Sequence, residues 1–270
     1  MKRPTSRLLA QLRTRQRPKL RTGAFQRMLP NLLTMLGLCS GLTAMRFALE
    51  GRFGAAAVAI AVSGCIDGLD GRIARLLKAT SRFGAEFDSL ADFLCFGVAP
   101  AFILYLWSLQ GARGFGFMPC LMFAVCMALR LARFNASIDS GSRPAYQSGF
   151  FTGVPAPAGA GLALFPLFGA LEARSLGWAG LEATFRHPLV SAGVLTGTAV
   201  LLVSTLPVWS GKNVRLPGRW VLPVLLGTGL YAALLVADPW AAFAAAGLLY
   251  VGVLPCSLRD YRRKRAASNE

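Results

Sequence analysis

Eight apolar stretches, each about the length needed to cross a lipid bilayer, dominate this 270-residue sequence. The hydrocarbon core of a bilayer is about 30 Å thick, so a spanning helix needs about 20 predominantly apolar residues. Only 15% of the residues are charged, too few to cover the surface of a soluble enzyme. The sequence therefore predicts an all-α integral membrane protein, a polytopic bundle of about eight transmembrane helices, at residues 30–49, 53–70, 86–109, 115–135, 150–171, 188–208, 219–237 and 239–257.

Charged and helix-breaking residues modify this pattern in three places. The second helix is expected to continue past the membrane surface through Arg75. Pro155 and Pro157 are expected to interrupt the fifth helix, which a membrane tolerates only where protein or water satisfies the freed backbone groups. Gly37 and Gly41 have the spacing that lets two helices approach closely.

The distribution of basic residues predicts the orientation and the domain boundaries. With the N-terminus in the cytoplasm, 24 of the 29 Lys and Arg residues lie on the cytoplasmic side, as expected for a cell-membrane protein with both termini inside. We expect a basic arm at 1–27, a membrane domain at 28–257 and a basic tail at 258–270. The arm leads directly into an apolar span, which favours anionic lipid headgroups over nucleic acid as its partner.

Five of the 12 acidic residues lie close together at the predicted membrane boundaries: Asp67, Asp70, Glu86, Asp88 and Asp92. Ionisable residues at membrane depth are costly and therefore mark functional sites. Spacings of three and four residues place Asp67 with Asp70 on one helical face and Asp88 with Asp92 on another. A tight connection around Ser81 would fold the second helix back onto the first. Four carboxylates are then expected to converge.

Four such carboxylates would repel one another unless cations supplied the missing charge. Carboxylate oxygens favour Mg²⁺ or Mn²⁺ over zinc, and bound ions of this kind hold phosphate oxygens. Gly68, Gly71 and Gly84 leave room for a nucleotide near the backbone, and Arg75 and Arg82 could meet phosphate charge. The alternative is a set of solvated helix-end charges with arginines bridged to aspartates.

These segments resemble the signature of the CDP-alcohol phosphotransferases, DxxDGxxAR(x8)GxxxDxxxD. The chain reads DGLDGRIAR at 67–75 and GAEFDSLAD at 84–92, with eight residues between, so every fixed position matches. Members of that family are membrane enzymes that move a phosphatidyl or similar group from a CDP-linked donor to an alcohol and release CMP. Many are homodimers, which the resemblance extends to this chain as an expectation.

The resemblance implies a role for each matching residue. Asp67, Asp70 and Asp88 would bind two metal ions, Mg²⁺ or Mn²⁺, and Asp92 would act as the general base and also contact the second ion. The donor would be held by residues of the signature and of the first span, namely Pro30, Asn31, Leu32, Leu33, Gly71, Arg75 and Ser81. Glu86 lies outside the signature and receives no role.

Other stretches resemble the bacterial and archaeal phosphatidylserine synthase branch, which uses CDP-diacylglycerol and L-serine. They are PNLLT at 30–34, FDSLADF at 87–93, GVAPA at 97–101, RLARFN at 130–135, FTGVPAP at 151–157 and VSTLP at 203–207, with Lys212. Arg130 and Arg133 are three residues apart, and an arginine can hold the serine carboxylate through two hydrogen bonds. Asn135 and Lys212 complete the acceptor-binding set that we expect. The two arginines could equally reflect membrane topology and contact with lipid phosphate.

Three alternatives remain at this point. The same chemistry could use choline, glycerol phosphate or inositol as the acceptor. An intramembrane prenyltransferase also uses aspartate-bound magnesium, but it lacks the DGxxAR segment. A cation transporter would carry acidic residues along a path across the membrane, whereas these cluster at one face, which is predicted to be cytoplasmic.

Overall fold

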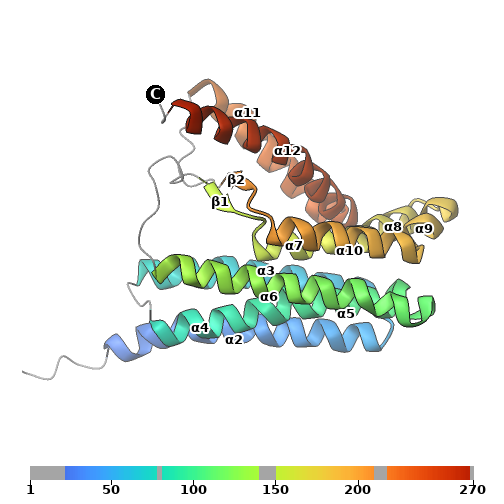
Figure 1. The fold of residues 1–270 in the computed structure, drawn as a ribbon, viewed down its shortest axis with the longest axis horizontal. Coiled ribbons are helices and arrows are strands. Elements are labelled where there is room, and N and C mark those ends of the chain that lie inside the picture. The colour runs from blue at the N-terminus through green and yellow to red at the C-terminus, as the bar shows by residue number, and fades with distance from the viewer. Residues whose placement is uncertain (1–21, 78–80, 140–149, 210–217, 268–270) are drawn as a thin grey trace, which may run out of the picture.

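The computed structural model describes residues 22–77, 81–139, 150–209 and 218–267, and most of them are helical (Figure 1). The α-helices are α2 (Thr22–Leu49), α3 (Phe53–Leu76), α4 (Arg82–Asp92), α5 (Ala99–Leu104), α6 (Phe117–Asp139), α7 (Ala156–Ala163), α8 (Phe165–Ser175), α9 (Ala179–Arg186), α10 (Pro188–Val203), α11 (Gly218–Ala237) and α12 (Pro239–Ala267). Two π-helical segments, η1 (Phe93–Val98) and η2 (Tyr105–Leu109), and a 3₁₀ segment, η3 (Gln110–Gly116), join α4, α5 and α6.

The helices form a bundle in which α2–α6 run side by side (Figure 1). Helices α7–α10 cover one side of this group, and α11 and α12 pair with each other beyond them (Figure 1). Helix α12 contacts α7 and α8, whereas α11 buries none of its residues. The acidic segments lie on α3 and α4, next to α2.

The described helices confirm an all-α polytopic membrane protein. Six helical segments are long and apolar enough to cross a bilayer: Met28–Leu49, Phe53–Leu76, Arg82–Ala112, Gly114–Ala136, Gly218–Ala237 and Pro239–Tyr261. Two further pairs, α7 with α8 and α9 with α10, bend by 47° and 54° and raise the number to eight if each pair is one span. The expected continuation of the second helix through Arg75 is confirmed, since α3 ends at Leu76.

The predicted interruption at Pro155 and Pro157 is wrong. Pro155 precedes α7 and Pro157 lies in its first turn, where the missing N–H would have no partner within the helix. The bend lies at Leu164, between α7 and α8, and Pro166 stands in the first turn of α8.

Two short strands also replace predicted helix. The strand β1 (Phe150–Thr152) pairs antiparallel with β2 (Pro207–Trp209), so the fifth span begins later and the sixth ends earlier than expected. Short apolar runs do not distinguish strand from helix, which explains the error.

Small residues allow α2 to approach its neighbours closely, as predicted for Gly37 and Gly41. A Cβ on Gly41 would lie 2.5 Å from the Cys95 sulfur at the start of η1. The Gly37 carbonyl accepts a hydrogen bond of 3.0 Å from Ser63 Oγ on α3. These contacts fix α2 against α3 and η1 beside the acidic residues.

Candidate active site

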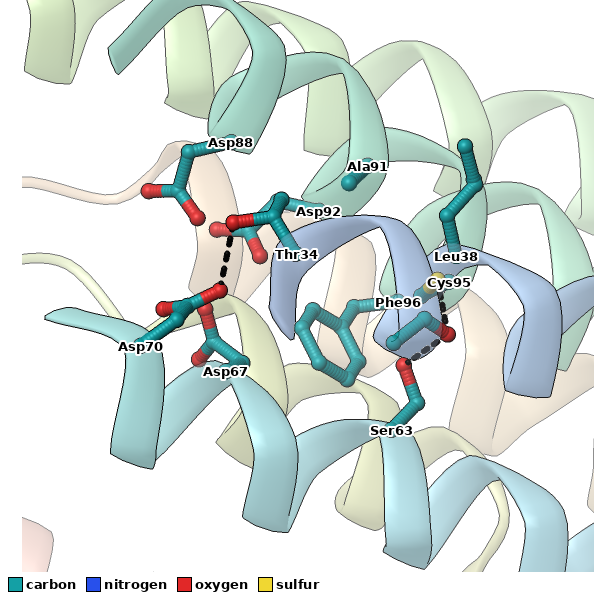
Figure 2. A pocket seen from close by; sticks show the side chains of 11 residues that line it. Thr34, Leu38, Ser63, Asp67, Asp70, Asp88, Ala91, Asp92, Cys95 and Phe96 are labelled. Carbon is teal, nitrogen blue, oxygen red and sulfur yellow. Dashed lines mark hydrogen bonds between the residues drawn. The ribbon is translucent and has the colours of Figure 1, made fainter. Parts of the chain in front are cut away.

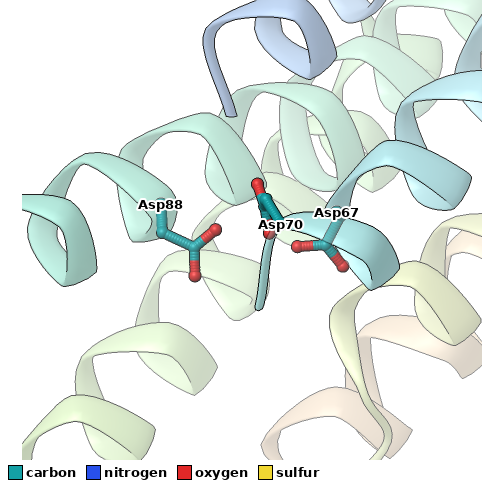
Figure 3. Close-up of side chains that lie close together, drawn as sticks. All are labelled: Asp67, Asp70 and Asp88. Carbon is teal, nitrogen blue, oxygen red and sulfur yellow. The ribbon is translucent and has the colours of Figure 1, made fainter. Parts of the chain in front are cut away.

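Helices α3 and α4 bring three carboxylates together. One oxygen each from Asp67, Asp70 and Asp88 lies within 4.8 Å of the others (Figure 3). Ion pairs join Glu50 to Arg46 and to Arg52, whereas Asp67, Asp70 and Asp88 form none with the residues that the structure describes. The salt-bridge alternative therefore finds no support, and a donor set of hard oxygens of this kind can hold a divalent cation.

Asp92 lies one turn beyond Asp88 on α4, beside the three-carboxylate group. It lines the same small pocket and lies within hydrogen-bonding reach of Asp67 (Figure 2). It is not one of the three mutually close carboxylates. The structure thus brings all four predicted aspartates to one place, with Asp92 at its edge.

Thr34 contacts the acidic group directly, a role that was not predicted from the sequence. Its Oγ1 donates a hydrogen bond of 2.7 Å to Asp70 Oδ2 and also lies 3.1 Å from the Pro30 carbonyl oxygen on its own helix (Figure 2). Asp70 is 4% exposed and Thr34 7%. Such a contact orients a carboxylate ligand and strengthens its hold on a metal. The available signal was a polar residue one turn beyond Pro30 inside an apolar span.

Replacement of Thr34 by Val is expected to weaken metal binding about 10- to 100-fold, because loss of an outer hydrogen bond typically has this effect. Binding of Mn²⁺ to the purified protein, measured by electron paramagnetic resonance, gives the affinity directly. Thr43→Val is the matched control, since the Thr43 hydroxyl donates to the Cys39 carbonyl at 2.7 Å on an exposed part of α2. Equal Mn²⁺ affinities for the two variants would contradict this role.

A cavity of about 180 Å³ adjoins the carboxylates, with Asp70 and Asp88 in its wall. Four of the predicted donor-binding residues line it: Pro30, Asn31, Gly71 and Ser81. A Cβ on Gly71 would meet no atom within 4 Å, so this glycine faces open space as expected.

The other predicted donor-binding residues lie outside this lining. Leu32 is exposed, and Leu33 is not part of the cavity wall. Arg75 is exposed one turn beyond Gly71, and its Nε donates to the Gly71 carbonyl at 2.9 Å. It therefore stands close to the cavity, where it could move to a phosphate.

Gly84 lines this cavity, as expected for a glycine that leaves room for a nucleotide, and its lack of a side chain also allows close packing. A Cβ there would lie 2.9 Å from Asn31 Oδ1 and 3.1 Å from Ser81 Oγ. Ser81 caps α4 by accepting a hydrogen bond of 3.0 Å from the Gly84 N–H. The glycine therefore allows Asn31 to lie close to the start of α4 at the cavity.

The structure separates the two arginines predicted to bind the acceptor. Arg133 donates to three carbonyl oxygens at the end of α10, at 2.7 to 3.3 Å, and thereby caps that helix. Arg130 donates its Nε to the Val154 carbonyl at 2.7 Å, and its charge interacts with those of Asp92 and Asp67. Of the two, Arg130 belongs to the acidic site.

Of the remaining predicted acceptor residues, one joins α6 to α4 and the other lies outside the described chain. Asn135 Nδ2 donates to Ser89 Oγ at 2.9 Å and so joins α6 to α4. Lys212 lies outside the described residues.

Comparison with known proteins extends over most of the chain. The family model described as CDP-alcohol phosphatidyltransferase matches residues 27–203, and a second, CDP-alcohol phosphatidyltransferase 2, matches residues 219–255. The second match covers α11 and most of α12, which lie beyond the resembling stretches given above.

Several curated relatives are similar in sequence to this chain. The CDP-diacylglycerol–serine O-phosphatidyltransferase of Mycobacterium tuberculosis (strain H37Rv) is 40% identical over 248 residues, which cover 91% of this chain and 83% of that protein. The protein of the same name from Helicobacter pylori (strain 26695) is 34% identical over 82% of this chain and 87% of its own. An archaetidylserine synthase from Methanothermobacter thermautotrophicus is 35% identical over 49% of this chain and 54% of its own.

Proposed function

Since the chain belongs to the CDP-alcohol phosphatidyltransferase family, we propose that it transfers the phosphatidyl group of CDP-diacylglycerol to the hydroxyl group of L-serine, with release of CMP. The observation that carries the chemistry is the convergence of Asp67, Asp70 and Asp88 beside a cavity lined by the signature residues. The names of the relatives that match 82–91% of the chain support serine as the acceptor.

The carboxylates would hold two Mg²⁺ or Mn²⁺ ions, with Asp67, Asp70 and Asp88 as the main ligands and Asp92 as a further contact. The hard oxygen donors and the lack of ion-pair partners within the described residues support this assignment. When bound, such ions neutralise the charge of the diphosphate and of the departing CMP.

The chain's own residues then bind and orient the two substrates. Asn31, Gly71 and Ser81 would contact the cytidine diphosphate in the adjoining cavity, with Arg75 near its phosphates. Asp92 would accept the proton of the serine hydroxyl as its oxygen bonds to the phosphorus that bears diacylglycerol. The bond from that phosphorus to the CMP oxygen breaks, and CMP leaves.

Arg130 would bind the serine carboxylate. Its Arg130→Ala variant is expected to raise the serine KM about 10- to 100-fold and to leave the KM for CDP-diacylglycerol nearly unchanged, because a hydrogen bond to a charged group contributes about 1.5–3 kcal/mol. Arg133→Ala should instead lower the thermal stability, since it removes three hydrogen bonds from the end of α10. Steady-state kinetics and thermal unfolding distinguish the two variants. If Arg133→Ala alone raised the serine KM selectively, Arg133 and not Arg130 would be the residue that binds the serine carboxylate.

We further propose that the protein lies in the cell membrane with its termini and active site in the cytoplasm, as the excess of basic residues on one side supports. The arm at 1–27 and the tail at 258–270 would contact anionic lipids, and no nucleic acid is required. The tail includes the end of α12, which continues to Ala267. A homodimer is the oligomeric state that the family resemblance favours.

The test of this function is CMP release by the purified protein supplied with CDP-diacylglycerol, Mg²⁺ and a panel of alcohols. Serine is expected to release CMP faster than choline, glycerol phosphate or inositol. Faster CMP release with one of the other three alcohols would show that this alcohol, and not serine, is the acceptor. The proposed transfer chemistry would then still stand. The family match gives no support to the prenyltransferase and transporter alternatives.

A further inference from the structure

A second cavity, of about 400 Å³, lies between the helical bundle and the pair formed by α11 and α12. Residues of α3, η1, α7, α8, α11 and α12 build its wall, and Tyr250 is the one described lining residue whose side chain carries oxygen. Its volume is in the range of about 300–1,000 Å³ that is typical of small-ligand sites. The cavity therefore suits an apolar ligand, which the proposed reaction has not yet placed.

This apolar cavity runs along α3 away from the acidic site. At one end Cys65 is exposed and precedes Asp67 by two residues, whereas at the other end Ala57 is fully buried. The lining on α7 changes in the same way, from the exposed Pro157 to the fully buried Leu164 just after the helix. The helical stretch from residue 57 to residue 65 is about 12 Å long, most of the about 15 Å of hydrocarbon in one leaflet.

Phe96 on η1 connects the apolar cavity with the acidic site. Its side chain lines both this cavity and the small pocket that contains Asp67 and Asp92 (Figure 2). Phe96 is 2% exposed, and a Cβ on Gly64 of α3 would lie 3.8 Å from its ring. One aromatic ring therefore stands between the carboxylates and the apolar cavity.

Two stacked aromatic rings line the buried end of the apolar cavity. The ring centroids of Phe168 on α8 and Phe243 on α12 are 5.1 Å apart, and the ring planes differ by 29°. Phe168 lies one turn beyond Leu164, so the stacked pair lies further from the aspartates than the exposed end does. Helix α12 thus contributes to the end wall of the cavity.

From this arrangement we infer that the apolar cavity receives one acyl chain of the CDP-diacylglycerol donor, and that the Phe168–Phe243 pair limits the length of that chain. The inference rests on the proposed function, in which the phosphorus that bears diacylglycerol lies at the carboxylates. The attached chain would then begin near Phe96 and Cys65 and extend along α3.

The surrounding bilayer decides how such a cavity acts. Lipid tails are as apolar as the cavity wall, so a chain gains little free energy by leaving the bilayer. A chain that is too short leaves a void without contacts, and one that is too long overpacks the site. The cavity would therefore select donors by chain length.

The test supplies the full-length enzyme with dioctanoyl and dipalmitoyl CDP-diacylglycerol together in the same detergent micelles, with serine and Mg²⁺. Gly161→Leu fills the cavity, since Gly161 lines it and a Cβ there would meet no atom within 4 Å. This variant is expected to lower kcat/KM for the dipalmitoyl donor about tenfold or more, the usual effect of overpacking. Values of kcat/KM for the dioctanoyl donor and of the serine KM should stay within about twofold.

Gly197→Leu is the matched control. Gly197 is an exposed helical glycine on α10 whose Cβ would also meet no atom within 4 Å, and it lies outside the cavity wall. It should leave the preference between the two donors unchanged. Phe243→Ala is the opposite change, because it removes one ring of the stacked pair. It should shift the preference from the dipalmitoyl donor toward the longer diarachidoyl donor.

Thermal unfolding shows whether each variant is folded. A folded Gly161→Leu variant that lost activity equally with both donors would overturn the inference, because the cavity would then hold a structural membrane lipid instead of the donor. An unchanged preference in Gly161→Leu would overturn it as well. If Gly161→Leu did not fold, an unchanged preference in Phe243→Ala would overturn the inference and the expected shift would support it. If the unsubstituted enzyme released no CMP with serine from either donor, the proposed function itself would fail, and this inference with it.

Discussion

Replacement of Asp67 by Asn is expected to reduce turnover about 10³-fold or more. Asp67 is one of the three mutually close carboxylates and also lines the small pocket with Asp92, so it contributes to both parts of the site (Figure 2). Metal ions stabilise transition-state charge by several kcal/mol, and each 1.4 kcal/mol is about tenfold in rate. Chelation of divalent cations should have an effect of the same size on the unsubstituted enzyme, reversed by added Mg²⁺ or Mn²⁺.

The measurement is the rate of CMP release as a function of Mg²⁺ concentration. Glu86→Gln is the control, because Glu86 is an exposed carboxylate on the same helix as Asp88 and lies outside the cluster. It should titrate with Mg²⁺ like the unsubstituted enzyme. Full activity in excess chelator would show that the carboxylates do not act through a metal.

Replacement of Asp92 by Asn is expected to lower kcat by about 10²- to 10⁴-fold, the usual contribution of a positioned general base. Because Asp92 lies outside both the three-carboxylate group and the donor cavity, the affinity for CDP-diacylglycerol should largely survive. The amide has nearly the same shape as the carboxyl group, so the small pocket beside Asp67 should be preserved.

Single-turnover kinetics with a titration of Mg²⁺ distinguish a base from a ligand. A lower rate with at most a slightly raised Mg²⁺ requirement is expected, because Asp92 is proposed to be the base and only a further contact of the ions. A strongly raised Mg²⁺ requirement with a rate restored at saturation would instead make Asp92 primarily a metal ligand. Normal turnover would remove it from the mechanism.

The aspartates could be predicted from the sequence because helical spacing alone decides which residues share a face. Asp67 and Asp70 share one face of α3, Asp88 and Asp92 share one face of α4, and the two pairs meet because both helices pack against α2. The number of apolar segments was predictable for a similar reason, since bilayer thickness fixes their length.

Contacts between residues far apart in the sequence could not be predicted in this way. Arg130 and Arg133 share a helical face, yet the former reaches Val154 and the latter reaches the end of α10. Their partners are brought to α6 by the path of the chain after residue 150. Thr34 was missed for the same reason, because its contact with Asp70 joins residues that are 36 positions apart.

The central claim is tested most directly by following labelled serine into lipid. The purified enzyme, supplied with CDP-diacylglycerol, Mg²⁺ and isotopically labelled L-serine, is expected to form one labelled phosphatidylserine for each CMP released, and chelator should stop both together. Release of CMP without label in the lipid would contradict the claim, because the phosphatidyl group would then pass to an acceptor other than serine.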